Sequence, residues 1–486
     1  MATTTTTSDC NCKQLHVAMF PWLAFGHMIP FLRLSKFIAE RGHKVSFLST
    51  KRNIQRLPEL PSHLKPFINL VELTFPHVPE LPFNAQATLD VRIPQDVHYL
   101  LKAVDGLKPE VARFLEQESP DWIIHDFFPY WLPPITTNLG ISRGYFSVIL
   151  SCYTAFGARL LKNGDDDLIT VEDLLVPPKW VPFQTNICCK KYEANKMLGK
   201  ASFHALTGDG GGVSNADRVV MAVKGCDGYF IKSCHEFESQ WLTHLQDSND
   251  VPVVPVGLLP PETSTIVGDD KEDKWMMFKN WLDGQPKGRV VYVALGSEIK
   301  LNKNDIDELA LGLELSELPF FWVLRKPAGS TESYSVELPD GFLERTCDRG
   351  IVWTSWVPQL EILRHESVGC FLTHGGTGSI VEGLMMGHPL VMLPMAVEQS
   401  LNSRLVVVEK QVGIEVPRND EDGSFTKESV AKSLIKIVVD DEGKIYKKNA
   451  MALGEMCGDR RLHKKYVDDF IDYLEKQRSV VASIEH

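Results

Sequence analysis

Short apolar runs alternate with longer amphipathic stretches along the chain, and the first such group lies near the N-terminus. The run LHVAMFPW (15–22) is followed by HMIPFLRLSKFIAE (27–40), in which apolar positions recur at helical spacing, and then by KVSFLST (44–50). Gly42 lies between the last two segments, where a glycine commonly ends a helix. The pattern therefore predicts strand, helix and strand, which together form a βαβ unit.

The same alternation continues through the first half of the chain. Apolar runs at 121–126, 228–233 and 251–257 are separated by helical patterns such as the one at 96–118. Strands of a parallel sheet are buried on both faces, and their sequences are therefore apolar throughout. We expect a parallel sheet with helices on both sides.

A change of composition after residue 251 separates two halves of the chain. Four prolines at positions 252, 255, 260 and 261 lie beside an acidic stretch that continues to residue 274. Apolar runs then resume at 290–297, 320–325, 350–357, 368–374 and 389–394. We expect two doubly wound α/β domains facing a cleft, with these boundaries: a first domain at 1–250, a linker at 251–275, a second domain at 276–443 and a helical tail at 444–486 that crosses back to the first domain.

Composition and charge narrow the class of protein. A chain of 486 residues is too long for one ordinary core, and 44% hydrophobic with 23% charged residues is typical of a globular protein. The formal charge of −12 argues against nucleic acid as a partner. The ten cysteines lack metal-site spacing, and neither a secretory leader nor a membrane span is predicted. A cytoplasmic location fits best.

The segment FLTHGGTGSIVEGL (371–384) places a strand, a histidine and three glycines ahead of a helical pattern. Glycines allow the backbone to approach a ligand closely, and the N-terminus of a helix attracts anions. The lysine of a phosphate-binding P-loop is missing, so backbone N–H groups, Ser379 and His374 would have to bind the anion. An alternative interpretation is a capping box, in which Ser379 and Glu382 only satisfy the helix end.

The stretch from Trp356 to Gln399 resembles the signature box of plant secondary-metabolite UDP-glycosyltransferases (glycosyltransferase family 1). The resemblance covers essentially the whole chain and is closest to the branch that adds a sugar to a sugar, which includes steviol-glycoside 1,2-glucosyltransferases. It implies the GT-B fold of two Rossmann-like domains. The matching residues are Trp356, Pro358, Gln359, His365, Gly369, Phe371, Thr373, His374, Gly376, Ser379, Glu382, Gly383, Gly387, Pro389, Pro394, Glu398 and Gln399.

The resemblance implies a role for each matching residue of the donor site. Trp356 would stack on uracil, Gln359 would bind the edge of uracil and ribose, and Glu382 would accept hydrogen bonds from the ribose hydroxyls. The diphosphate would be held by His374, Ser379 and Ser297, and the sugar by Glu398 and Gln399. Val357, Thr377 and Gly378 complete the implied donor-binding set.

One part of the box departs from the family. The usual Cys-Gly-Trp-Asn-Ser after the histidine is here Gly375-Gly376-Thr377-Gly378-Ser379. The missing asparagine at 378 removes one phosphate donor, so donor affinity and donor choice are expected to differ.

A histidine is the usual base for an acceptor hydroxyl, and His27 is the candidate. It lies between the first strand and the first helix, where the positive end of the helix dipole is expected to keep the imidazole neutral. Asp126 ends the run DWIIHD and would orient His27, as in the family, whereas His125 points to the opposite face by strand alternation. A structural role for a solitary histidine at a strand end is the alternative.

The acceptor site is predicted from aromatic residues near the mouth of the cleft, which suit an apolar ring system or are core residues: Trp22, Phe127, Phe128 and Trp131. No metal is expected, because the acidic stretches at 164–168 and 439–443 have the composition of solvated loops.

The resemblance implies a monomeric enzyme without a cofactor. It would transfer glucose from UDP-glucose, with inversion, to a small-molecule glycoside, preferentially to the 2-hydroxyl of a glucose on a steviol-type diterpenoid. Flavonoid glycosides or simple aglycones are alternative acceptors. A noncatalytic UDP-sugar-binding protein is an alternative of another class, and a nicotinamide oxidoreductase is disfavoured because the first strand is not followed by the glycine fingerprint.

Overall fold

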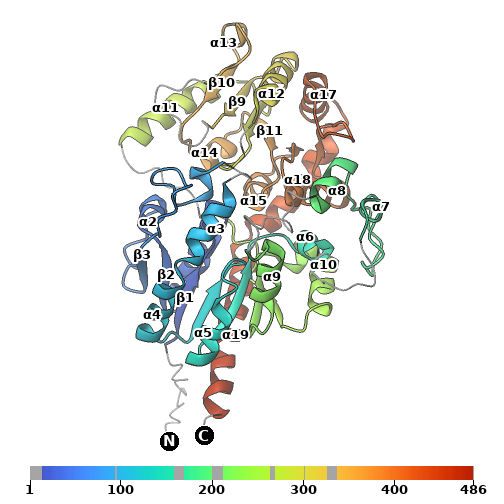
Figure 1. Cartoon of the computed structure of the whole chain (residues 1–486). Helices are drawn as coiled ribbons and strands as arrows, with labels where there is room; N and C mark the ends of the chain where they lie inside the picture. The colour runs from blue at the N-terminus through green and yellow to red at the C-terminus, as the bar shows by residue number, and fades with distance from the viewer. Residues whose placement is uncertain are drawn as a thin grey trace, which may run out of the picture.

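The strands form two parallel sheets, one in each half of the chain (Figure 1). The computed structural model describes residues 14–92, 96–157, 169–199, 212–262, 269–299, 301–325 and 336–484. The strand orders are β3-β2-β1-β4-β5-β6-β7 and β10-β9-β8-β11-β12-β13. Each sheet begins in its middle and winds outward in both directions, which confirms the predicted pair of doubly wound domains.

Most strands coincide with the apolar runs of the sequence. The N-terminal sheet contains β1 (His16–Phe20), β2 (Lys44–Thr50), β3 (Ile68–Leu73), β4 (Trp122–His125), β5 (Ser142–Ser147), β6 (Gly228–Ile231) and β7 (Val253–Pro255). The C-terminal sheet contains β8 (Val290–Ala294), β9 (Phe320–Val323), β10 (Gly350–Trp353), β11 (Val368–Thr373), β12 (Leu390–Met392) and β13 (Gly413–Glu415).

Helices connect the strands and cover both sheets. The first half contains α1 (Phe25–Glu40), α2 (Lys51–Arg56), α3 (Val97–Asp105), α4 (Lys108–Glu118), α5 (Leu132–Leu139), α6 (Ser151–Gly157), α7 (Val171–Leu174), α8 (Lys191–Leu198), α9 (Asn215–Val223) and α10 (His235–Asp247). The second half contains α11 (Asp269–Asp283), α12 (Lys303–Leu315), α13 (Phe342–Arg345), α14 (Gln359–Arg364), α15 (Thr377–Met385), α16 (Val397–Arg404), α17 (Lys427–Val438), α18 (Gly443–Gly458) and α19 (Arg460–Ile484).

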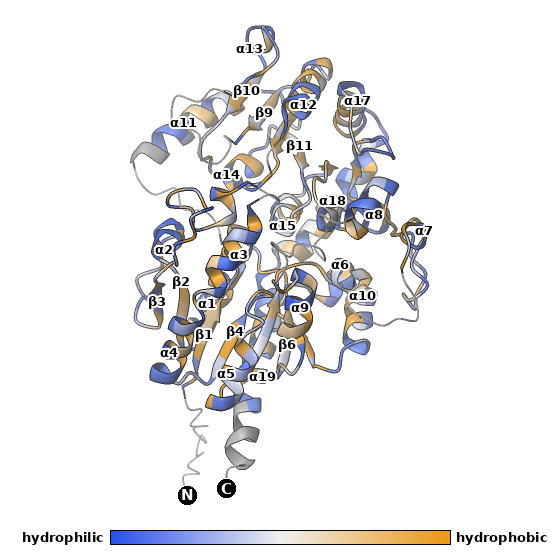
Figure 2. Cartoon of the chain, in the orientation of Figure 1, coloured by the Kyte–Doolittle hydropathy of each residue, from blue (hydrophilic) through white to orange (hydrophobic). Residues whose placement is uncertain are grey.

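The central strand β1 shows how the N-terminal sheet is buried on both faces. Val17 and Met19 pack into a cluster with residues of α1 and α19, whereas Ala18 and Phe20 pack into a second cluster with residues of α3, α4 and α5. All four side chains are fully buried. Figure 2 shows apolar residues concentrated in central strands such as β1 and β4. Side chains of alternate direction along one strand therefore bind both helical layers to the sheet.

The last helix, α19, runs along the N-terminal half although it follows the C-terminal domain in sequence (Figure 1). The indole of Trp122 on β4 donates to the carbonyl of Leu474 at 3.2 Å. At the exposed rim, Arg41 pairs with Asp468 at 2.9 Å and with Asp472 at 3.0 Å. The tail thus joins the two halves by a second connection besides the linker.

A buried group of charges also joins the two halves. Arg404 on α16 forms hydrogen bonds of 2.9 and 3.0 Å with the two carboxylate oxygens of Glu193 on α8. Arg404 also pairs with Glu415, which accepts a hydrogen bond of 2.6 Å from Lys190. Because Glu193 is 1% exposed, its charge depends on these partners and α8 is held against the C-terminal domain.

Candidate functional site

The candidate functional residues lie at the carboxyl ends of the strands where each sheet changes its winding direction. In the N-terminal sheet this point lies between β1 and β4, which lead to His27 and Asp126. In the C-terminal sheet it lies between β8 and β11, which lead to Ser297 and His374. Open α/β sheets bind ligands at such switch points. Each domain therefore has its candidate residues at the edge of the sheet where a ligand is expected.

His27 and Asp126 form a hydrogen-bonded pair. The distance from Nδ1 of His27 to Oδ2 of Asp126 is 2.8 Å. Asp126 also accepts hydrogen bonds from the backbone N–H groups of Trp22 at 3.1 Å and Phe127 at 2.8 Å, which fix its carboxylate. Since a carboxylate accepts hydrogen bonds, the proton of His27 lies on Nδ1 and its Nε2 is free to act as a base. The side chain of His27 is 20% exposed, so that base is accessible.

The structure corrects the expectation about the charge of His27. Burial lowers the pKa of its imidazole, but the charge and hydrogen bond of Asp126, together with the charges of Glu298 and Glu398, outweigh burial. The pKa is therefore raised above the ordinary 6.5, in contrast to the effect predicted from the helix dipole alone. His27 can accept a proton only above this raised pKa, where it is neutral.

His125 lies on the other side of β4. It is fully buried, its Nδ1 is 2.8 Å from the carbonyl of Asp126, and its Nε2 is 3.7 Å from the sulfur of Cys226. Burial and the charge of Arg143 lower the pKa of His125 to about 3, so it stays neutral. It has no access to the cleft and does not act as the partner of His27.

Glu298 is a candidate site residue that the sequence interpretation missed. It accepts a hydrogen bond of 2.7 Å from the hydroxyl of Thr88, which belongs to the N-terminal domain. This contact joins the two domains. Glu298 directly follows Ser297 in the run ALGSE, and that adjacency was the available signal. Burial and the charge of Glu298 raise the pKa of Glu398, which shows that these carboxyls share one region.

The glycine-rich turn after β11 wraps around His374. A Cβ atom at Gly376 would lie 2.5 Å from Nε2 of His374, and a Cβ atom at Gly296 would lie 2.8 Å from the same atom. Gly375 has a φ of 89°, which other residues rarely adopt, and its carbonyl accepts a hydrogen bond of 3.0 Å from Asn402. Burial lowers the pKa of His374 to about 4, so the ring is neutral in this turn.

The start of α15 decides between an anion site and a capping box. The helix begins at Thr377 after Gly376, and no side chain caps it. Ser379 therefore lies within the first turn instead of at the N-cap, and the capping-box alternative is wrong. The first N–H groups of the helix, those of Thr377, Gly378 and Ser379, have no partner within a helix and are suited to an anion.

Gln359 and Glu382 form one hydrogen-bonded group. Gln359 donates to Glu382 at 2.7 Å and accepts from the hydroxyl of Tyr292 at 3.0 Å. Trp356 is 43% exposed and offers a ring face, whereas Val357 is buried, so a donor contact at 357 would have to come from its backbone. One stacking side chain and two polar side chains are suited to bind the base and the ribose of a nucleotide.

Gln399 is oriented by its own helix. Its side-chain oxygen accepts hydrogen bonds from the N–H groups of Met395 at 3.0 Å and Ala396 at 3.1 Å, and its amide nitrogen donates to Glu398 at 3.1 Å. Gln399 is 7% exposed. It therefore fixes Glu398 at the start of α16, while Glu398 faces the region of His27.

The four aromatic residues predicted for the acceptor divide into two groups. Phe127 is partly exposed and its ring centre lies 6.2 Å from that of His27, with Trp22 packed behind it at 5.5 Å. Phe128 is fully buried, and Trp131 is 5% exposed with its indole on Asp105. Trp22 is 4% exposed and belongs to the same buried cluster as Phe128 and Trp131. The prediction of acceptor contacts is corrected for these three side chains, which fill the core, and Phe127 is the partly exposed one of the four.

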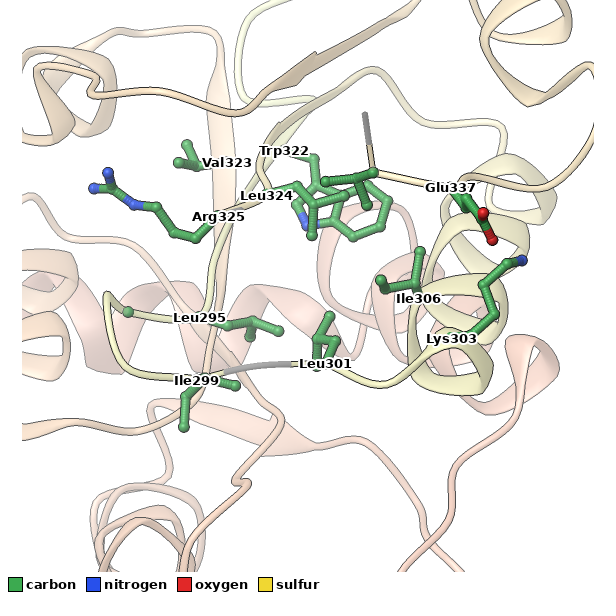
Figure 3. A pocket seen from close by; sticks show the side chains of 12 residues that line it. Leu295, Ile299, Leu301, Lys303, Ile306, Trp322, Val323, Leu324, Arg325 and Glu337 are labelled. Atoms are coloured by element: carbon green, nitrogen blue, oxygen red, sulfur yellow. The ribbon is translucent and has the colours of Figure 1, made fainter. Parts of the chain in front are cut away.

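A cavity of about 150 Å³ lies beside Gly296 in the C-terminal domain. Figure 3 shows the side chains of Leu295, Leu301, Ile306, Trp322 and Leu324 gathered at its centre, with Arg325 at one end and Lys303 and Glu337 at the other. His27 and Asp126 do not line this cavity.

The described parts of the chain offer neither a metal site nor a membrane helix. Those residues contain no group of three or more histidine, cysteine, aspartate or glutamate side chains suited to a metal ion. The acidic stretch at 164–168 lies outside them, while Asp441 of the other stretch is exposed and pairs with Lys444. No helix within the described ranges has the length and apolarity for a membrane span.

Comparisons with known proteins agree with this geometry. The family described as UDP-glucoronosyl and UDP-glucosyl transferase matches residues 262–469. UDP-glycosyltransferase 91D1 of Stevia rebaudiana is 58% identical over 100% of this chain and 97% of its own length. Anthocyanidin-3-O-glucoside rhamnosyltransferase of Petunia hybrida is 34% identical over 96% and 97%. The crystal structure of UGT73P12 of Glycyrrhiza uralensis superposes with a TM-score of 0.77 over 97% of this chain and 98% of that one, at 22% identity, which confirms the GT-B fold.

Proposed function

The chain belongs to the UDP-glycosyltransferase family, and from this premise we propose that it transfers glucose from UDP-glucose to the 2-hydroxyl of a glucose on a diterpenoid glycoside. Transfer of a sugar from a UDP-sugar to a small molecule is the activity of the family. The identity of the sugar, of the acceptor and of the linkage forms the proposal.

One observation carries the proposal. The pair of His27 and Asp126 in one domain and the anion site of the other domain lie at switch points that face each other. His27 hydrogen-bonds to Asp126 after β1 and β4, and the uncapped start of α15 follows β11. The contact between Thr88 and Glu298 brings the two edges together. A nucleotide held at α15 would therefore present its sugar to an acceptor beside His27.

The geometry supports a single displacement. Nε2 of His27 would take the proton of the acceptor hydroxyl, whose oxygen attacks the anomeric carbon as the bond to the UDP oxygen breaks. Asp126 would stabilise the imidazolium through the 2.8 Å hydrogen bond. Charge on the departing diphosphate would be stabilised by the first N–H groups of α15 and by Ser379. Because attack comes from the face opposite UDP, the α-linked donor yields a β-glycoside.

A glycoside as acceptor is supported by the name of a relative and by the side chains near His27. The Petunia hybrida relative is named for a glucoside acceptor. In this chain, Glu298 and Glu398 lie near His27, and carboxylates are good acceptors for sugar hydroxyls. Phe127 provides an apolar surface beside them for a ring system. A glycoside satisfies both kinds of surface, whereas an aglycone contacts only the apolar one.

The same relative is named a rhamnosyltransferase, so UDP-rhamnose is the second candidate donor. We also propose that the enzyme is a metal-independent cytoplasmic monomer. In this proposal helix N–H groups and neutral donors stabilise the diphosphate, because hydrogen bonds to a charged group contribute about 1.5–3 kcal/mol each. The eight cysteines within the described residues are unpaired, as in a reducing compartment.

The test is a screen of UDP-glucose and UDP-rhamnose against steviol-type and flavonoid glucosides and their aglycones, with mass spectrometry and NMR of the products. We expect a hexosylated diterpenoid glucoside with a β-1,2 linkage, formed equally in EDTA. A product formed from aglycones alone would contradict the proposed acceptor. A rhamnosylated product would identify UDP-rhamnose as the donor in place of UDP-glucose. UDP binding without UDP release in any reaction would favour a noncatalytic protein.

A further inference from the structure

A continuous line of polar contacts crosses from the nucleotide subsite to the N-terminal domain. It runs from Tyr292 through Gln359 to one oxygen of Glu382. The other carboxylate oxygen of Glu382 lies 3.8 Å from a terminal guanidinium nitrogen of Arg33. The other terminal nitrogen of Arg33 donates to the carbonyl of Leu259 at 3.0 Å. Arg33 therefore joins α1, the interdomain linker and α15.

Arg33 is held in a fixed position by its surroundings. Its side chain is 19% exposed and that of Glu382 is 17% exposed, so water screens their attraction only in part. Leu259 has a φ of 47°, a conformation that a residue other than glycine rarely adopts. Such a linker conformation persists only where its surroundings hold it, and the hydrogen bond from Arg33 is one of the contacts that do so.

A buried lysine, Lys232, interacts electrostatically with Arg33 and Glu382. Lys232 follows β6 at the carboxyl end of the N-terminal sheet and is 1% exposed. Burial and the charge of Arg33 lower the pKa of Lys232 to about 7, whereas Glu382 raises it. The carboxylate of Glu382 thus acts on the N-terminal domain although it belongs to the other domain.

We propose that Arg33 is a positioning residue for donor binding: it holds the carboxylate of Glu382 oriented toward the ribose hydroxyls of the nucleotide. The proposal rests on the proposed function, in which Glu382 accepts hydrogen bonds from ribose. According to the proposal, the N-terminal domain and the linker contribute to donor affinity although the nucleotide binds to the C-terminal domain. Loss of Arg33 would raise KM for the donor and leave KM for the acceptor unchanged.

The helix α1 offers a matched control. Lys36, three residues after Arg33, pairs with Glu262 of the linker at 3.3 Å instead of with Glu382. Lys36→Gln therefore removes a cation and a linker contact from the same helix while leaving Glu382 untouched. Arg33→Gln removes the cation that faces Glu382, and Arg33→Lys retains the charge but loses the planar fork.

The experiment is isothermal titration of each folded variant with UDP and with 2′,3′-dideoxy-UDP, which lacks both ribose hydroxyls. We expect Arg33→Gln to weaken UDP binding about 5- to 20-fold, which is less than the loss of a direct hydrogen bond to a charged group because the Arg33–Glu382 contact is 3.8 Å long, and Arg33→Lys to weaken it less. Lys36→Gln should leave both affinities within about two-fold, and Arg33→Gln should leave the dideoxy affinity within the same limit. In a Glu382→Gln background the effect of Arg33→Gln should disappear.

Two results would overturn the proposal while leaving the proposed function intact. The first is wild-type affinity for UDP in Arg33→Gln. The second is an equal loss of UDP and dideoxy-UDP affinity, which would assign Arg33 to the fold instead of to Glu382. Wild-type protein that binds no UDP would overturn the proposed function itself, and the role of Arg33 with it.

Discussion

Replacing Asp126 by asparagine changes the charge next to the base while preserving the shape of the side chain. In the wild type, the carboxylate accepts hydrogen bonds from His27 at 2.8 Å and from the N–H groups of Trp22 and Phe127. The amide group of asparagine has one acceptor oxygen for these three donors. Phe127 donates to one carboxylate oxygen, and Trp22 and His27 share the other. We expect the amide oxygen to keep the N–H of Phe127 and the NH2 group to replace the shared oxygen, so that His27 loses its anionic partner.

The magnitude follows from the lost contact. A hydrogen bond to a charged group contributes about 1.5–3 kcal/mol, so stabilisation of the imidazolium falls by that amount. At about 1.4 kcal/mol per factor of ten, kcat should decrease about 10- to 150-fold. The affinity for UDP should be unchanged, because Asp126 lies in the opposite domain.

The pH profile gives a second readout of the same substitution. The wild-type pKa of His27 is raised chiefly by Asp126, against the lowering effect of burial. Only the neutral imidazole is active, so wild-type activity falls as the pH decreases through this raised pKa. Asp126→Asn removes the largest raising cause, and the acidic limb of kcat/KM should move to lower pH.

The assay is initial UDP release between about pH 5 and 9, the range in which histidines titrate, together with calorimetric titration of UDP. An acidic limb that moves to higher pH, or a kcat within about threefold of the wild type, would refute the assigned pair. A parallel loss of UDP binding would indicate that the substitution damages the fold instead.

Three further predictions concern the surrounding charges and the altered box. Glu298→Gln removes a charge that raises the pKa of His27, so the acidic limb of its kcat/KM profile should move to lower pH, and an unchanged profile would contradict the proximity of the two groups. Gly378→Asn fits the fold, since a Cβ atom there meets no atom within 4 Å. The added amide can donate to the diphosphate, so calorimetry should show UDP affinity increased about 3- to 10-fold. Weaker binding would contradict a diphosphate at this helix start. Glu193→Ala leaves the buried cation of Arg404 with one anionic partner, so denaturant unfolding should show a loss of about 3–5 kcal/mol, and a loss below about 1 kcal/mol would show that water replaces the carboxylate.

The sequence predicted those parts of the fold that apolar runs encode. Strand β8 is apolar throughout and β1 is apolar after His16, and their positions follow from that pattern. Strand β5 was missed because its letters are SRGYFS; Ser142 and Arg143 are buried through partners elsewhere in the chain. The helical pattern at 96–118 is divided into α3 and α4 at Gly106, whose close contact with Pro76 depends on tertiary packing.

Site residues on one strand end or in one motif were easier to identify than contacts between domains. His27 and Asp126 follow neighbouring strands, so the rule for parallel sheets places them together. The contact of Thr88 with Glu298 joins residues 210 positions apart, and no local pattern encodes it. The helix-dipole argument failed for His27 because it left out the effect of Asp126 on the pKa, which is the largest raising effect, as well as the charges of Glu298 and Glu398 from the other domain.

The central claim is that the imidazole of one domain acts on a sugar nucleotide held by the other. His27→Ala tests it directly when the UDP dissociation constant and the transfer rate are measured on one preparation. The account predicts UDP affinity within about twofold of the wild type and a kcat reduced about 100- to 10,000-fold. A kcat within about threefold of the wild type would contradict it, as would UDP affinity lost together with turnover.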